Sequence, residues 1–141
     1  MTFDITLGNW RALGDAARVV RSAVFIDEQK VPVELEWDEM DAVSLHAIAV
    51  DAAGQVCGTG RLLPDGHIGR MAVRRDVRGQ GIGAAILAAL MRAAQARGQS
   101  KVMLNAQIQA QAFYARFGFV CEGEEFEDAG IAHIHMRCRF V

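Results

Sequence analysis

Three glycines alternate with other residues in the stretch Arg78-Gly79-Gln80-Gly81-Ile82-Gly83-Ala84, which an arginine opens. Glycine has no Cβ, so its backbone N–H groups can approach an anion closely. An apolar run at helical spacing begins at Ile82. The first N–H groups of a helix are unpaired and lie at the positive end of its dipole. The arginine, the spaced glycines and the helix start together predict a cradle for a pyrophosphate.

Two other phosphate-binding patterns fit this loop less well. A P-loop ends in Gly-Lys-Ser or Gly-Lys-Thr, and this sequence has no such ending. The dinucleotide fingerprint requires Gly-x-Gly-x-x-Gly, whereas the spacing here is Gly79-x-Gly81-x-Gly83. The structural alternative is a glycine-rich turn that joins a strand to a helix without any ligand.

The loop must be positioned by the elements on either side of it. His67 to Val73 is predicted to form the preceding strand, and Gly81 to Arg97 the following helix, which ends at the C-cap residue Gly98. The remaining elements are predicted from apolar periodicity and turn residues. They are strands over 2–7, 44–51, 56–63, 101–105, 119–122 and 131–140, and helices over 15–25 and 110–117, with Asp15 as the N-cap of the first helix.

The chain has 141 residues, of which 52% are hydrophobic, and we expect a single domain over 1–141. Hairpins followed by alternating strands and helices predict an α/β or α+β fold. The net charge of −2 argues against binding to nucleic acid or to an anionic membrane through bulk charge.

The cysteines and the N-terminal residues indicate the cellular compartment of the protein. The cysteines, Cys57, Cys121 and Cys138, are odd in number and contain no Cys-x-x-Cys pair, so free thiols in a reducing compartment are expected. No signal peptide and no apolar stretch of bilayer length is recognisable. These features predict a cytoplasmic protein.

The loop resembles the Arg/Gln-x-x-Gly-x-Gly/Ala motif of the GNAT superfamily of acetyl-CoA-dependent N-acetyltransferases. A second family landmark follows in the expected order, as strand 102–105 and then Ala112-Phe113-Tyr114-Ala115-Arg116-Phe117-Gly118-Phe119. The resemblance covers about Phe25 to Met136. Residues 24–29 and 130–134 are similar to the small ElaA/YjcF-like branch, although Ala129-Gly130-Ile131-Ala132-His133 departs from its Asp-Gly-Ile-Pro-His pattern.

The resemblance implies a mixed central sheet of six to seven strands, flanked by about four helices, with a splayed strand pair that forms the cofactor cleft. Acetyl-CoA would be the acyl donor, and its pantetheine would lie along one strand like an additional strand. The implied cofactor-binding residues are Met71, Ala72 and Val73 on the strand, Arg78, Gly79, Gln80, Gly81, Ile82, Gly83 and Ala84 in the loop, and Phe113 and Phe117, which would wall the cofactor channel. Asn105 would bind the cofactor or orient Tyr114 near its sulfur.

The implied reaction is transfer of an acetyl group to a primary amine, either of a small molecule or of a lysine side chain, by direct attack in a ternary complex without a metal. Tyr114 is the candidate acid for the departing thiolate. The structural alternative for this lone tyrosine is a core aromatic residue. Glu28, His133 and His46 are the candidate bases, and the alternative for His133 is a half-buried strand position.

Three further expectations remain open. A metal site formed by His133, His135 and Cys138 is disfavoured, because Cys138 falls on the opposite face of the strand. The last strands are candidates for pairing across a homodimer. An acyl-CoA-binding or sensing domain without catalysis is the alternative function.

The segment from Glu34 to Asp41 is rich in carboxylates. A solvated charge run is the simpler interpretation of such a segment. The alternative is that these carboxylates attract a cationic amine toward the thioester.

Overall fold

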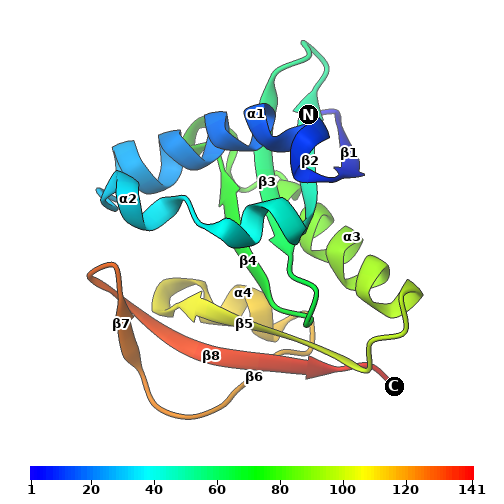
Figure 1. The fold of residues 1–141 in the computed structure, drawn as a ribbon, viewed down its shortest axis with the longest axis vertical. Coiled ribbons are helices and arrows are strands. Elements are labelled where there is room, and N and C mark those ends of the chain that lie inside the picture. The colour runs from blue at the N-terminus through cyan, green and yellow to red at the C-terminus, as the bar shows by residue number, and fades with distance from the viewer.

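The computed structural model describes residues 1–141 and contains two sheets with helices packed around them (Figure 1). The first sheet is antiparallel and has the order β1 (Phe3–Gly8), β2 (Leu45–Asp51), β3 (Val56–Leu62), β4 (Ile68–Val73). In the second sheet β8 (Ile131–Arg139) pairs with β5 (Lys101–Gln107), β6 (Val120–Cys121) and β7 (Phe126–Asp128). The predicted α/β class is confirmed, with eight strands in two sheets.

The helical elements are α1 (Trp10–Arg21), the π-helix η1 (Ser22–Glu28), α2 (Val33–Glu36), the 3₁₀ helices η2 (Glu39–Val43), η3 (Arg75–Val77) and η4 (Ile108–Ala110), α3 (Ile82–Ala96) and α4 (Gln111–Ala115). The predicted start of the first helix was wrong. Asn9 caps α1 by accepting a hydrogen bond from the Ala12 N–H at 2.9 Å, and Asp15 lies exposed inside the helix. None of these helices combines the length and the apolar character that crossing a bilayer requires.

Strands β4 and β5 meet at one end and then diverge. The contact is a parallel bridge between His67 and Met103, and β4 has no strand partner on that edge beyond it. The register of β4 against β3 shifts next to Gly60, and Arg70 adopts a positive φ of 47° at the shift. A bulge of this kind bends a strand and increases its twist. The predicted splayed strand pair is therefore formed by β4 and β5.

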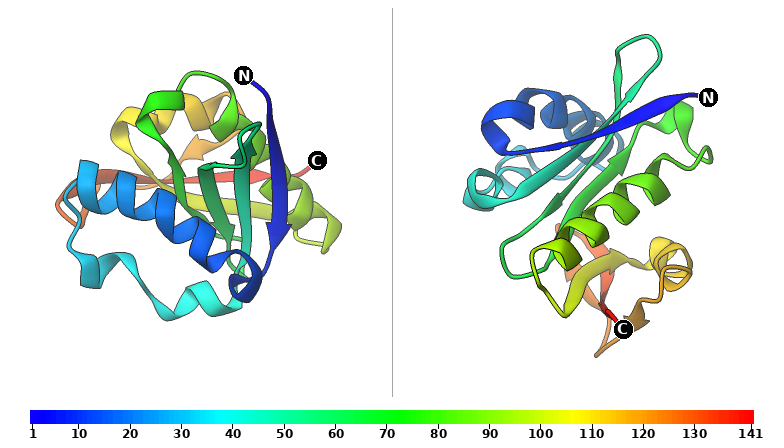
Figure 2. Two further views of the ribbon diagram at one scale, coloured as in Figure 1. Left: turned by 90° about the horizontal axis from the view of Figure 1, so that it is seen from above. Right: turned by 90° about the vertical axis from the view of Figure 1, so that its right-hand side faces the viewer.

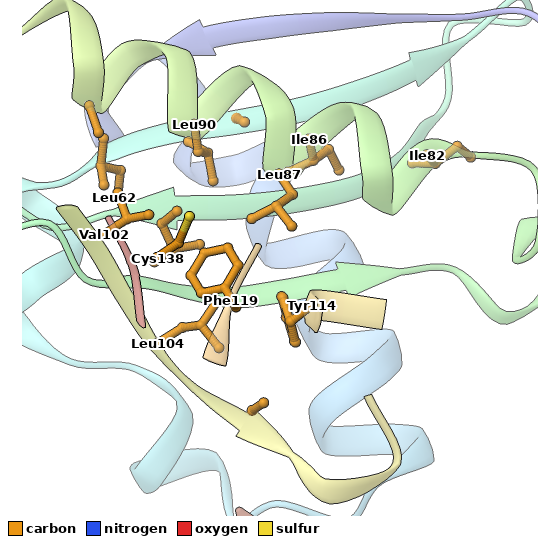
Figure 3. Packing of buried hydrophobic residues seen from close by; sticks show 14 of the residues in the cluster. Leu62, Ile82, Ile86, Leu87, Leu90, Val102, Leu104, Tyr114, Phe119 and Cys138 are labelled. Atoms are coloured by element: carbon orange, nitrogen blue, oxygen red, sulfur yellow. The ribbon is translucent and has the colours of Figure 1, made fainter. Parts of the chain in front are cut away.

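Helices α1 and α3 cover opposite faces of the first sheet (Figure 2). Helix α3 lies close to β3 because β3 presents glycine at alternate positions. A Cβ at Gly58 would come within 2.7 Å of the Ile82 side chain, and one at Gly60 within 2.9 Å of Ile86. The apolar side of α3 contributes to the main core between the two sheets, which Tyr114 also joins (Figure 3). This packing fixes the start of α3, and hence the glycine loop, against the end of β4.

The acidic run is only partly solvated: Glu34 and Glu39 are exposed, whereas Glu36, Asp38 and Asp41 are partners of arginines. Arg21 is 1% exposed and donates to Glu36 Oε1 and to Asp41 Oδ1, each at 2.7 Å. Arg61 donates to Asp38 Oδ1 at 2.6 Å and to Asp41 Oδ1 at 2.9 Å. Burial is the largest influence on the pKa of Glu36 and raises it. This charge cluster holds α2 and η2 against α1 and the first sheet.

Candidate functional site

The glycine loop borders a cavity of about 830 Å³, here called the loop cavity. It is lined by four groups of residues, namely Met71, Ala72 and Val73 at the end of β4, Val77, Arg78, Gly79 and Gly81 in the loop, Ile82, Gly83 and Ala84 at the start of α3, and Ala110, Phe113, Tyr114, Arg116 and Phe117 around α4. Most of the residues predicted to bind a pyrophosphate-bearing ligand are thus brought together. Gln80 and Asn105 are predicted members that do not line this cavity.

The backbone of the loop is shaped for an anion. Gly79 and Gly81 have φ values of 80° and 85°, which other residues adopt only with strain, and a Cβ at either position would meet no atom within 4 Å. Gly81 is the N-cap of α3 and has no side chain to satisfy the first amides of the helix. The N–H groups that precede the first i−4 bond, from Ala85 to the Gly81 carbonyl, are therefore available to a ligand.

Replacing Gly81 with alanine tests this cradle. We expect Gly81→Ala to weaken binding of coenzyme A about tenfold, because the strained loop loses a charge-assisted hydrogen bond to the diphosphate. Gly98→Ala is the matched control, since Gly98 follows Arg97, the C-cap residue at the other end of α3, and has a φ of 88° with open space around it. Both variants should lose about 1–2 kcal/mol of stability to backbone strain. Equal coenzyme A affinity for the two variants, measured by calorimetry, would show that the cradle does not hold the ligand.

A second cavity of about 330 Å³, here called the hairpin cavity, is bordered in part by the β7–β8 hairpin. Its lining includes Phe25 and Gln29 around η1, Glu36 of α2, and His133 of β8. Met71, Ala110 and Tyr114 line both this cavity and the loop cavity. The two cavities therefore meet at these three residues, at the point where β4 and β5 have separated.

Tyr114 is buried in the wall between the cavities, and Figure 3 shows its side chain beside Phe119. Its ring makes edge contacts with Phe113 and Phe119, with centroids 5.1 and 5.9 Å apart. Burial raises the pKa of the Tyr114 phenol to about 12. The phenol is therefore protonated at neutral pH and can donate a proton to a group in either cavity.

His133 lines the hairpin cavity and is half-buried. Its Nδ1 donates to the Ile131 carbonyl at 2.7 Å, because a carbonyl oxygen can only accept. The neutral ring then carries its free lone pair on Nε2. The ring also stacks on Phe126, with centroids 5.9 Å apart. His133 thus has a fixed orientation and a nitrogen able to take up a proton.

The other candidate bases lie elsewhere. His46 is 1% exposed and contacts the Asp41 carbonyl through Nε2 at 2.8 Å, which places it next to the charge cluster. Burial lowers the pKa of His46. Glu28 lines neither cavity, and both of its carboxylate oxygens accept hydrogen bonds from Arg78. This ion pair lowers the pKa of Glu28, which weakens it as a base.

Asn105 lies in the hairpin cavity rather than beside the glycine loop. Its Oδ1 accepts a hydrogen bond from His135 Nδ1 at 2.9 Å, across the register pair that joins β5 to β8. The predicted contact between Asn105 and the pyrophosphate-bearing ligand therefore lacks support from its position. No group of three or more histidine, cysteine or acidic side chains is arranged to hold a metal ion.

Sequence reasoning missed most of the polar residues that line the hairpin cavity, among them Asp128, Gln29, Gln107 and His67. Gln29 and Gln107 exchange side-chain amide hydrogen bonds of 2.9 and 3.3 Å and so connect η1 to the end of β5. His67 contacts Asp65 Oδ2 through Nδ1 at 2.8 Å. Of Gln29, Gln107 and His67, only His67 carried a local signal, because it follows Pro64-Asp65-Gly66, a sequence typical of a turn.

Comparison with known proteins gives matches along most of the chain. The family model described as an acetyltransferase (GNAT) domain matches residues 15–140. The chain is 42% identical over 121 residues to the uncharacterised N-acetyltransferase YjcF of Bacillus subtilis, an alignment covering 83% of this chain and 86% of that protein.

Two solved structures are similar over nearly the whole chain. An acyl-CoA N-acyltransferase from Pseudomonas aeruginosa is 33% identical with a TM-score of 0.86, covering 97% of this chain and 99% of that one. Escherichia coli ElaA, at 24% identity and a TM-score of 0.86, covers 98% of this chain and 100% of that one and shares its fold.

Proposed function

This chain belongs to the GNAT family of acetyltransferases, and on that premise we propose that it transfers an acetyl group from acetyl-CoA to a primary amine. The family supports acyl transfer from an acyl-CoA donor. The single observation that carries it is the meeting of two cavities at Tyr114, one beside an anion cradle and one beside His133.

The donor would occupy the loop cavity. The amides of residues 79–84 would receive the diphosphate, and Phe113 and Phe117 would pack against the pantetheine arm. The backbone of Met71, Ala72 and Val73 would pair with that arm along the open edge of β4. This placement brings the thioester to the wall that Tyr114 occupies.

The acceptor would enter the hairpin cavity, which is large enough for a small amine or the end of a lysine side chain. Asp128 lines it without any ion pair within the chain, whereas Arg61 and Arg70 are neutralised by carboxylates of the charge cluster. The uncompensated charge in the cavity is therefore negative, which favours a cationic amine over an anionic acceptor.

The reaction needs few side chains. The neutral amine attacks the thioester carbon, so that a C–N bond forms and the C–S bond breaks. His133 Nε2 takes the proton that the amine gives up, and Tyr114 gives its phenolic proton to the departing thiolate. A backbone N–H near Ala72 would stabilise the oxyanion. No metal takes part in this proposal.

Location and assembly remain proposals as well. We place the protein in the cytoplasm, where its three free cysteines would remain reduced. Pairing of the last strands across a homodimer stays a prediction. The alternative, an acyl-CoA sensor without catalysis, is less favoured because Tyr114 and His133 both border the acceptor side.

A thiol-release assay tests the function. With acetyl-CoA and a panel of monoamines, diamines and lysine peptides, we expect free coenzyme A to appear with at least one cationic amine. Mass spectrometry of the product should show a gain of one acetyl group. Tight binding of acetyl-CoA with no release on any amine would favour the sensor instead.

A further inference from the structure

Arg78 is the cation of the glycine loop, yet three of the five N–H groups of its guanidinium are already engaged within the chain. Its Nη1 and Nη2 donate to the two oxygens of Glu28 at 2.7 and 2.6 Å, and its Nε donates to the Val73 carbonyl at 2.9 Å. Such a parallel pair is the geometry with which a guanidinium also binds a phosphate. Glu28 therefore occupies the fork that a diphosphate in the loop cavity would use.

Glu28 is also connected through the chain to residues that line the hairpin cavity. It is the last residue of η1, and Phe25 and Gln29, three residues before it and one after, both line the hairpin cavity. Gln29 is in turn held to β5 by the reciprocal amide pair with Gln107. The Glu28–Arg78 ion pair thus connects the loop that borders one cavity to the segment that borders the other.

A bound diphosphate would place negative charge beside this carboxylate. Because Arg78 lowers the pKa of Glu28, the carboxylate is ionised at neutral pH and competes with the diphosphate for one guanidinium. The pair is partly exposed, with side chains 40% and 26% accessible, so exchange of Arg78 to a second anion needs no opening of the core.

We propose that Glu28 is a positioning residue that competes with the donor diphosphate for Arg78, so that donor binding releases η1 and adjusts the acceptor cavity. This inference rests on the proposed function, because it takes coenzyme A as the ligand of the loop. Glu28 then acts through Arg78 and does not touch the reacting atoms.

Removing the charge of Glu28 should tighten donor binding. We expect Glu28→Gln to lower the Kd for coenzyme A about two- to fivefold, the range for a partly exposed ion pair. Pantetheine, which lacks the diphosphate, should bind both proteins equally. Asp27→Asn is the matched control, since Asp27 is an exposed neighbouring carboxylate outside the ion pair, and its removal should leave the Kd unchanged.

A double-mutant cycle completes the test by calorimetry. Arg78→Gln should weaken coenzyme A binding, and adding Glu28→Gln to it should cause no further change, because the competitor has lost its target. The inference is overturned if Glu28→Gln leaves coenzyme A binding unchanged or weakens it, or if Asp27→Asn tightens it equally. Absence of coenzyme A binding by the unmodified protein would instead overturn the proposed function, and this inference with it.

Discussion

Tyr114→Phe is expected to lower kcat for acetyl transfer by about 10²–10⁴-fold while leaving the Kd for coenzyme A within about twofold of the unmodified value. The substitution removes only the phenolic oxygen, and the ring keeps its edge contacts with Phe113 and Phe119. The loss should therefore come from the unprotonated leaving thiolate and not from repacking. Steady-state thiol release measures kcat and calorimetry measures the Kd. Both measurements on the same preparation therefore separate a loss of catalysis from a loss of coenzyme A binding.

The pH profile adds a second check on Tyr114. An acid catalyst must be protonated, so its contribution is present below its pKa and is lost as pH rises through it. With a pKa of about 12, the Tyr114 phenol stays protonated throughout the range in which the assay works. The ratio of unmodified to variant kcat should accordingly be constant between about pH 7 and 9. An unchanged kcat in Tyr114→Phe would leave Tyr114 as a core aromatic residue.

The second large effect is expected at Arg21, at the centre of the charge cluster. Arg21→Met preserves most of the side-chain volume but leaves Glu36 and Asp41 buried without their shared partner. Breaking a buried ion pair in this way costs about 3–5 kcal/mol. Urea unfolding at pH 7.5 should show this loss. It should be smaller at pH 5, because burial already raises the pKa of Glu36 and this carboxyl takes up a proton more readily once Arg21 is gone.

Arg18→Met is the matched control for Arg21→Met. Arg18 lies one turn earlier on α1, is half exposed and forms its one ion pair with Asp15 at 3.5 Å. Like Arg21, it also lies over the rings of Trp10 and Trp37, so the two substitutions lose the same cation–π contacts. Its loss should cost about 1 kcal/mol. Equal destabilisation by the two substitutions would show that the cluster contributes nothing special to the position of α2 and η2.

Local patterns predicted the elements that carry the donor side of the site. The strand over 68–73, the glycine loop and α3 follow one another in sequence, so alternation, the glycines and the apolar stripe contain the needed information. The order and spacing of the glycine loop and the segment that contains Tyr114 were recognised from the family resemblance. The start of α1 was missed because Asn9 and Asp15 are both good N-caps, and the choice between them depends on where β1 ends.

The pairings between distant residues were not predictable from one sequence. Glu28 and Arg78 are 50 residues apart, and Arg21 and Asp41 are 20 apart. The acidic run therefore resembled a solvated face, although three of its carboxylates, Glu36, Asp38 and Asp41, are paired with arginines from α1 and β3. Likewise, Asn105 was assigned to the donor on the family pattern, and only the register of β5 against β8 places it beside His135.

Calorimetric titration of the unmodified protein tests the central claim most directly, namely that the loop before α3 holds the diphosphate of coenzyme A. We predict saturable one-to-one binding of coenzyme A and of acetyl-CoA, with no competition from ATP or NAD at equal concentration. Heat from ATP or NAD in the absence of any heat from coenzyme A would contradict the account and assign the loop to a nucleotide-binding module.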